Sequence, residues 1–333
     1  MKHLHCFYIL AFACLLTACG DSDTPAEVRK QLHILFSVNG LGDMGYNDCL
    51  LTGIQRVRKA HAEADFYFYN PASEAEAEEV FRTWLEKESE VSSLFVLAAS
   101  DYEAMAKRLL PNHPPIGNKE ILLFESKNPD GLPLHSFDIS MYGASFLAGV
   151  AAVCCTPLPP LVLLGNSEDA SVQEGVDGFT DGYRFFAEAT EVATLALADD
   201  WTGYSSAETA YRNMFEWAQL YGFIFPIAGG SNMGIYRYLR EYPKGIYTAG
   251  MDVDQSPLCT QITGSVVKHI DRLLEEQLTQ WIETGAFPSA HLYGLESGCV
   301  EWLLSPDYEE ALGTAMKEYL GIAILKEKEY EEN

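Results

Sequence analysis

Residues 33–69 read HILFSVNGLGDMGYNDCLLTGIQRVRKAHAEADFYFY, and this stretch decides the fold class. An apolar run at 33–37 leads through a glycine-rich loop into a helical pattern at 48–62, and a second apolar run follows at 66–69. A strand, a loop, a helix and a second strand in this order form a unit whose two strands run parallel. The stretch therefore predicts an α/β protein.

The same alternation continues to about residue 250. Further strands are expected at 94–97, 120–124, 161–164, 193–197, 223–227 and 246–249, with helices at 74–87, 102–110, 142–153, 172–187, 205–220 and 233–241. This is too many strands for one compact unit. We therefore expect a break at 132–138 and two doubly wound parallel-sheet lobes joined by a hinge. The first lobe would hold 31–137 plus 256–290, and the second 138–255 plus 291–325.

The N-terminus carries the pattern of an export signal. Lys2 precedes an apolar run of about ten residues that ends at Leu16-Thr17-Ala18-Cys19, which is the layout of a secretory signal peptide. Because a cysteine follows Leu-Thr-Ala, the end of this run resembles a bacterial lipobox. Residues 1–18 would then be removed, Cys19 would carry the lipid, and residues 19–30 would form a flexible tether. We expect an exported lipoprotein, anchored to a membrane on its periplasmic or cell-surface face.

The net charge of −26, from 48 acidic and 22 basic residues, restricts the partners. Nucleic acids and anionic lipid head groups would be repelled by such a surface. Phosphorylated small ligands are disfavoured too, unless basic residues gather at one site. We therefore expect no nucleic-acid partner.

The glycine-rich loop Gly40-Leu-Gly-Asp-Met-Gly45 has the form of a dinucleotide fingerprint. Asp43 argues against that function, because its carboxylate would repel a pyrophosphate. The acid expected after the second strand is also missing, since Asn70 stands there. Alternatively, the loop presents Tyr46 and Asn47 to a planar polar ligand. A purely structural interpretation, with Asp48 capping the helix and Tyr46 packing, is equally compatible with the loop.

Catalytic motifs are missing from the sequence. There is no G-x-S-x-G elbow, no H-E-x-x-H, no P-loop and no Cys/His spacing of a zinc site. A pair of carboxylates, as in glycosidases, leaves no sequence signature, so that alternative stays open. We expect a protein that is not an enzyme and that has no cofactor and no metal.

Several segments resemble the basic membrane protein family, the purine nucleoside receptor type of substrate-binding lipoproteins serving ABC transporters. The chain has AGMDVDQ at 249–255 and ITGSVVK at 262–268, similar to the family's G-V-D-x-D-Q turn and T-S-x-x-K helix start. Further similar segments lie, in the family's order, at 142–151, 225–234 and 293–300. The resemblance implies a type I periplasmic-binding-protein fold with a ligand between the lobes.

The family's ligand contacts can be carried over to single positions. Its D-x-x-F-N loop falls on Asp43, Tyr46 and Asn47, with tyrosine replacing the phenylalanine that stacks on the base. Its second stacking aromatic falls on Phe225 in the other lobe. The resemblance therefore implies a base held between two aromatic side chains.

The remaining carried-over contacts are polar. The aspartate that holds the ribose hydroxyls falls on Asp252, and the lysine on Lys268. Three positions depart from the family: Ser37 and Glu125 stand where it has aspartates, and Asn232 where it has a glycine. These departures reshape the polar pocket, so the resemblance leaves the identity of the ligand open.

Each of these residues also has a structural interpretation. Phe225 is a core residue by default, Lys268 would be solvated at the start of a helix, and Asp252 would cap a turn. Trp201 and Tyr204 fit the core or the rim better than the pocket. The resemblance implies a receptor that captures a nucleoside-like small molecule and delivers it to an ABC permease. The alternative is a sensing or surface-interaction lipoprotein that binds a non-nucleoside ligand.

Overall fold

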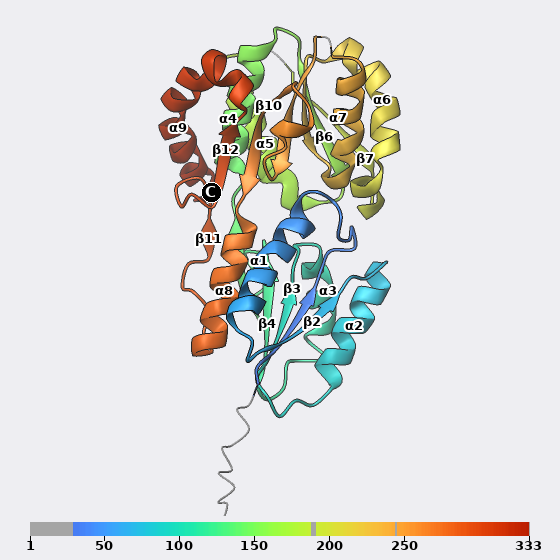
Figure 1. Ribbon diagram of the computed structural model, residues 1–333, viewed down its shortest axis with the longest axis vertical. Coiled ribbons are helices and arrows are strands. Elements are labelled where there is room, and N and C mark those ends of the chain that lie inside the picture. The colour runs from blue at the N-terminus through green and yellow to red at the C-terminus, as the bar shows by residue number, and fades with distance from the viewer. Residues whose placement is uncertain (1–28, 188–190, 244, 333) are drawn as a thin grey trace, which may run out of the picture.

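The computed structural model describes residues 29–187, 191–243 and 245–332. These residues form two lobes, and each lobe is a six-stranded sheet with helices on both faces (Figure 1). The sheet orders are β11-β5-β4-β3-β1-β2 and β12-β10-β9-β8-β6-β7. Each pair of neighbouring strands runs parallel, except for the antiparallel pair β10–β12. The prediction of two doubly wound lobes is confirmed.

The first lobe lies at the bottom of Figure 1 and the second at the top. The first contains β1 Gln31–Leu35, α1 Tyr46–Ala60, β2 Asp65–Tyr69, α2 Glu74–Glu86, β3 Ser93–Leu97, α3 Tyr102–Leu109, β4 Lys119–Phe124, β5 His135–Ile139, α8 Ile270–Thr284 and β11 Leu292–Tyr293. The second contains α4 Tyr142–Cys155, β6 Pro160–Asn166, α5 Gln173–Arg184, β7 Ala193–Ala198, α6 Ala207–Leu220, β8 Phe223–Ile227, α7 Asn232–Glu241, β9 Tyr247–Asp252, β10 Ile262–Lys268, β12 Val300–Leu304 and α9 Glu309–Glu331.

The central strands are apolar because helices cover both faces of each sheet. In β3 (SLFVL) and β8 (FIFPI) every residue is buried, as a parallel sheet between helices requires. The edge strands β2 and β7 contain exposed residues instead. Continuous apolar runs with no alternation therefore mark the middle of each sheet.

The chain crosses between the lobes three times, after β5, after β10 and after β11. The break predicted at 132–138 is wrong, because β5 occupies most of that stretch and pairs with β4. The predicted lobe boundaries are also wrong at two places. Residues 262–268 form β10, which pairs with β9 in the second sheet, and β11 pairs with β5 in the first sheet.

The segment 262–268 was expected to begin a helix and forms a fully buried strand instead. Its β-branched residues favour an extended backbone between β9 and β12, and the helix α8 begins two residues after Lys268. This changes the position of Lys268, which ends a central strand.

The small residues of α4 allow it to pack closely against α5. A Cβ added at Gly182 would lie 2.0 Å from the carbonyl oxygen of Phe146, and one added at Gly149 would lie 2.2 Å from the carbonyl oxygen of Phe179. Both distances are below any real contact, so the two helix backbones touch where the glycines lie.

The N-terminal predictions fall mostly outside the described residues. The signal peptide 1–18, the lipidation site Cys19 and the tether up to residue 28 lie there. Among the helices that the structure describes, none has the length and apolar character needed to cross a bilayer.

Replacing Gly182 with alanine should destabilise the protein through the α4–α5 contact. The added methyl group meets a backbone oxygen that cannot move aside cheaply, so we expect the free energy of unfolding to fall by about 1–3 kcal/mol. Gly321→Ala in α9 is the matched control, since a Cβ there has no neighbour within 4 Å. It should be neutral or stabilising by up to ~1 kcal/mol. Urea unfolding curves compare the two variants, and equal effects would contradict the close contact.

Candidate functional site

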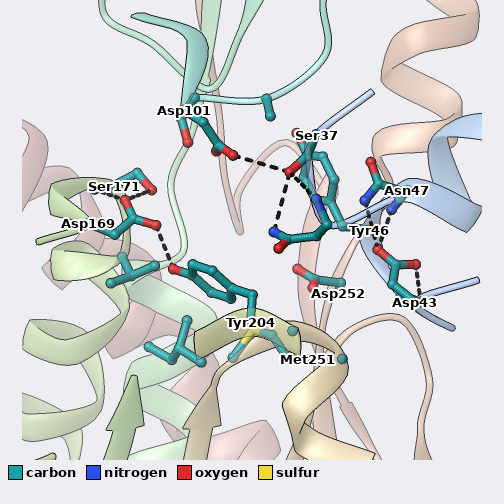
Figure 2. A pocket seen from close by; sticks show the side chains of 18 of the residues that line it. Ser37, Asp43, Tyr46, Asn47, Asp101, Asp169, Ser171, Tyr204, Met251 and Asp252 are labelled. Carbon is teal, nitrogen blue, oxygen red and sulfur yellow. Dashed lines mark hydrogen bonds between the residues drawn. The ribbon is translucent and has the colours of Figure 1, made fainter. Parts of the chain in front are cut away.

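The carboxyl ends of strands from both sheets meet at one pocket between the lobes (Figure 2). This is where ligands bind in open α/β sheets, because the loops that follow the strands meet there. Eight of the nine predicted ligand-binding residues line the pocket: Ser37, Asp43, Tyr46, Asn47, Glu125, Asn232, Asp252 and Lys268. Their role in binding stays a prediction, but the structure brings them together.

Lys268 joins the two lobes within this pocket. Its Nζ lies 3.2 Å from Oε1 of Glu125, which follows β4 in the first lobe, and 3.3 Å from Oδ1 of Asp252, which ends β9 in the second. The side chains are 7%, 13% and 12% exposed for Lys268, Glu125 and Asp252. Nζ also lies 5.0 Å from the centre of the Tyr46 ring, within range of a cation–π interaction. A buried ammonium thus has an aromatic face and two carboxylates as partners.

The partners keep Lys268 charged in spite of its burial. Burial by itself lowers the pKa of the Lys268 ammonium, but Glu125 and Asp252 raise it above its ordinary value. Burial raises the pKa of Glu125, and Lys268 opposes that rise. The charges of this group therefore depend on one another.

Both carboxylates project from an unusual backbone conformation. Glu125 has φ 52° and Asp252 has φ 68°, which is the left-handed region that residues other than glycine rarely adopt. Such a residue costs on the order of 1–3 kcal/mol and persists only where its surroundings impose it. Here each strained residue ends or follows a strand and forms an ion pair with Lys268, so the strain serves the geometry of the pocket.

Asp43 organises the glycine-rich loop. Its carboxylate accepts hydrogen bonds from the amides of Gly45 (2.9 Å) and Asn47 (2.8 Å) and from Nδ2 of Asn47 (3.1 Å). Asp48 accepts from the amides of Gly42 and Met44. The backbone amides of the loop therefore donate to carboxylates of the same loop, so these amides are not free to bind a pyrophosphate. This agrees with the argument against a dinucleotide site.

Two amide oxygens in the pocket have no hydrogen-bond partner among the described residues. They are Oδ1 of Asn47 in the first lobe and Oδ1 of Asn232 in the second, and both are buried. Nδ2 of Asn47 donates to Asp43, and Nδ2 of Asn232 donates to the carbonyl oxygen of Pro226. Those two partners only accept, so each amide is held with its oxygen turned away from them. Each lobe therefore offers an acceptor that needs a donor from a ligand.

Phe225 does not line the pocket, so the prediction that it does is wrong. Its side chain is fully buried and stacks on Phe179 of α5, with ring centres 4.5 Å apart. Phe225 is the third residue of β8, so it lies under the covering helix. Ile227, at the end of the same strand, reaches the pocket.

The second lobe supplies other aromatic residues, which sequence reasoning assigned to the core or rim. Trp201 and Tyr204 line the pocket and stack on each other, with ring centres 5.4 Å apart. The hydroxyl of Tyr204 donates to Asp169 (Figure 2). A Cβ added at Gly165 would lie 2.5 Å from the Tyr204 ring, so the glycine makes room for it. The sequence feature that could have assigned them to the pocket is their position at 201–205, in the loop that follows a strand.

Two acids of the pocket were also missed. Asp101 follows β3 and accepts a hydrogen bond from the Ser37 hydroxyl at 3.1 Å, and Asp169 follows β6. Burial, and then the charge of Asp169, raise the pKa of Asp101 to about 7. With Asp43, Glu125 and Asp252, the pocket has five carboxylic acids and one lysine among its described lining residues. It is therefore suited to a ligand rich in hydrogen-bond donors, and unsuited to a phosphate.

Comparisons with known proteins identify relatives of this chain. The family profile described as "Bmp: ABC transporter substrate-binding protein PnrA-like" matches residues 30–328. Basic membrane protein C of Borreliella burgdorferi is 25% identical over 199 residues, which are 56% of this chain and 55% of that protein. The chain thus matches about half the length of this curated relative.

Solved structures show the same fold at low sequence identity. A solute-binding protein of an ABC transporter system from Aeropyrum pernix K1 has a TM-score of 0.68 at 17% identity, covering 90% of this chain and 86% of its own. The periplasmic component of an ABC-type sugar transport system from Hahella chejuensis has a TM-score of 0.59 at 14% identity, covering 79% and 97%. These likenesses establish the type I periplasmic-binding-protein fold.

Removing the charge of Lys268 should destabilise the protein in a pH-dependent way. In Lys268→Met two buried carboxylates lose their cation, and we expect unfolding free energy to fall by about 3–5 kcal/mol at pH 8. The folded-state pKa of Glu125 is already raised and would rise further, so the folded state binds a proton that the unfolded state releases. Stability lost at pH 8 is therefore partly regained as the pH falls towards 5.

The control is Lys317→Met. Lys317 is 79% exposed and pairs with Glu309 on the surface, so its loss should cost at most about 1 kcal/mol. Urea unfolding at pH 5 and pH 8 makes the comparison. Equal losses at the two pH values for Lys268→Met would show that Glu125 does not depend on Lys268.

Proposed function

Because this chain belongs to the Bmp family of PnrA-like ABC transporter substrate-binding proteins, we propose that it is a receptor that captures a nucleoside-like solute between its lobes. One observation carries the proposal: eight residues that the family resemblance assigns to ligand binding line one pocket between the lobes. Those positions come from segments more than 200 residues apart in the chain, from Ser37 to Lys268.

The proposed contacts follow the chemistry of each side chain. The Tyr46 ring stacks on the base, and Asn47 and Glu125 bind its polar edge. Asp252 and Lys268 hold the sugar hydroxyls. The unpartnered oxygens of Asn47 and Asn232 accept from amino or hydroxyl groups of the ligand. Nothing in this assignment is a catalytic group, and the protein acts as a binding protein.

The second aromatic contact is assigned to Tyr204 and Trp201 in place of Phe225. These rings line the pocket from the second lobe, whereas Tyr46 lines it from the first. Stacking on a base contributes about 1–3 kcal/mol for each aromatic side chain. A base held by rings from both lobes would favour the closed arrangement.

Ligand capture then works by a shift between open and closed arrangements. The ligand touches both lobes only when they are closed, so binding favours closure. The closed form would be presented to an ABC permease, which takes up the solute. Anchoring through Cys19 would keep the receptor at the membrane surface, since two or more acyl chains hold a protein stably there.

A second candidate is a sensor or surface-interaction lipoprotein with a non-nucleoside ligand. The observation that favours it is the set of five acids around the pocket, which also suits an amine or a sugar. Ser37 and Glu125, two of the three positions where the chain departs from the family, also suit a different ligand. Neighbouring genes for a permease and an ATPase would favour transport, and a neighbouring histidine kinase would favour sensing.

Thermal melting of the purified protein against nucleosides, bases, sugars and amino acids tests the ligand class. A ligand at about 100 times its dissociation constant adds roughly 2.7 kcal/mol of stability, which is easily detected. We expect a rise in melting temperature with at least one nucleoside. If no nucleoside has an effect and another class does, the ligand assignment is wrong and the receptor function remains.

Asp252→Asn tests the sugar contact. Asparagine tolerates the positive φ of this position but loses the charge, so affinity for a ribonucleoside should fall about 10- to 100-fold, equivalent to about 1.5–3 kcal/mol. A 2′,3′-dideoxy analogue should lose much less. Asp254→Asn, two residues on and exposed, is the control and should bind normally. Isothermal titration measures all four combinations, and equal losses for the two ligands would remove Asp252 from the sugar site.

A further inference from the structure

A second charged cluster lies where the lobes connect, outside the ligand pocket. Asp138 in β5 and Lys127 after β4 belong to the first lobe. Glu174 in the first turn of α5 and Glu331 at the end of α9 belong to the second. None of the four lines the proposed ligand site, so the function proposed above gives them no role.

One ammonium group faces three carboxylates in this cluster. Nζ of Lys127 lies 2.8 Å from Oε2 of Glu331, 3.1 Å from Oε1 of Glu174 and 3.6 Å from Oδ2 of Asp138. The last distance is too long for a hydrogen bond. One ammonium group therefore faces three carboxyl groups, so the cluster has more acidic groups than basic ones.

Two buried oxygens of the cluster have no hydrogen-bond partner among the described residues, namely Oδ2 of Asp138 and Oε1 of Glu331. Their side chains are only 13% and 9% exposed. The other oxygen of Asp138 accepts from the amide of Ile139 at 3.0 Å, which holds that carboxylate in place. Buried carboxylate oxygens without a donor are costly, so they point to a partner that the chain itself does not provide.

We propose that Asp138, Glu174 and Glu331 form a Ca²⁺ site at the connection between the lobes. One oxygen from each of the three lies within 4.8 Å of the others. Two ligands on opposite sides of Ca²⁺ are separated by about 4.8 Å, twice a bond of about 2.4 Å. Mg²⁺ demands a near-ideal octahedron, whereas Ca²⁺ accepts irregular sites such as one built from three separate segments of the chain. Carboxylates are the ligands that hard cations prefer, and Asp138 and Glu174 border a second opening, where water would complete the coordination.

Lys127 acts as the replaceable occupant of this site. Its side chain is 51% exposed, so the ammonium can move into solvent when the cation replaces it. Lys268 is only 7% exposed and has no such freedom. The two lysines therefore differ in exposure although each lies among carboxylates.

The position of the site gives the cation a mechanical role. Asp138 stands one residue before the end of β5, where the chain crosses to the second lobe, and the other two ligands belong to that lobe. The second opening also shares Asp101, Glu125 and Asp169 with the ligand pocket. A bound cation would tie the lobes together beside the pocket and so would bias their closure.

The test uses the purified full chain, stripped with EDTA and titrated with CaCl₂ and MgCl₂ by calorimetry. The wild-type protein should bind one Ca²⁺ saturably and more tightly than Mg²⁺. Glu331→Gln should weaken Ca²⁺ at least 10-fold. Glu332→Gln, the neighbouring exposed residue with the same change of charge, should bind as wild type.

Lys127→Met gives a second, opposite readout. In EDTA the variant should melt at a lower temperature than wild type, because the three carboxyl groups have lost the Lys127 ammonium. Ca²⁺ should restore the melting temperature of the variant and should bind it more tightly than it binds wild type. Ca²⁺ at about 100 times its dissociation constant should raise the wild-type melting temperature by roughly 5 °C. The proposal is overturned if neither wild type nor Lys127→Met binds Ca²⁺ saturably, if Ca²⁺ fails to stabilise Lys127→Met, or if Glu331→Gln binds as wild type.

Discussion

The buried ammonium of Lys268 is the constraint on which the site depends. Taking a charge out of water costs several kcal/mol, which only partners of opposite charge in good geometry can offset. Glu125 and Asp252 supply that geometry from two different lobes, and each adopts a positive φ to do so. All three residues end or follow strands whose carboxyl ends face the pocket, so the two parallel sheets bring them together. These ion pairs therefore link the two lobes at the pocket.

The sequence was sufficient for the fold class, because the alternation of strands and helices is a local pattern. It was insufficient for the lobe boundaries. The segment at 262–268 contains β-branched residues that suit either a strand or the first turn of a helix, and only its pairing with β9 decides the matter. The two-residue strand β11 has no sequence signal at all, since its extended form comes from β5 beside it.

The site was predictable where a residue ends a strand, and less so elsewhere. Ser37, Glu125, Asp252 and Lys268 all lie at or just after strand ends, so the rule for parallel sheets places them together. Phe225 lies in the middle of its strand, where a covering helix buries it. The resemblance of its segment to a family motif led to the wrong prediction that it contacts the ligand. Trp201 and Tyr204 are the opposite case, because an aromatic residue in a loop gives no sign of the direction in which it points.

The pocket and the connection between the lobes present the same electrostatic problem with different solutions. In both, an excess of carboxylates surrounds a single lysine, in a chain whose net charge is −26. In the pocket the lysine is enclosed and its two carboxylate partners have positive φ angles, so replacing the lysine should destabilise the protein. At the connection the lysine is half exposed and two carboxylate oxygens stay without partners. The two sites therefore differ in the exposure of the lysine. The enclosed Lys268 is a fixed part of its ion pairs, whereas the half-exposed Lys127 can be exchanged for another cation.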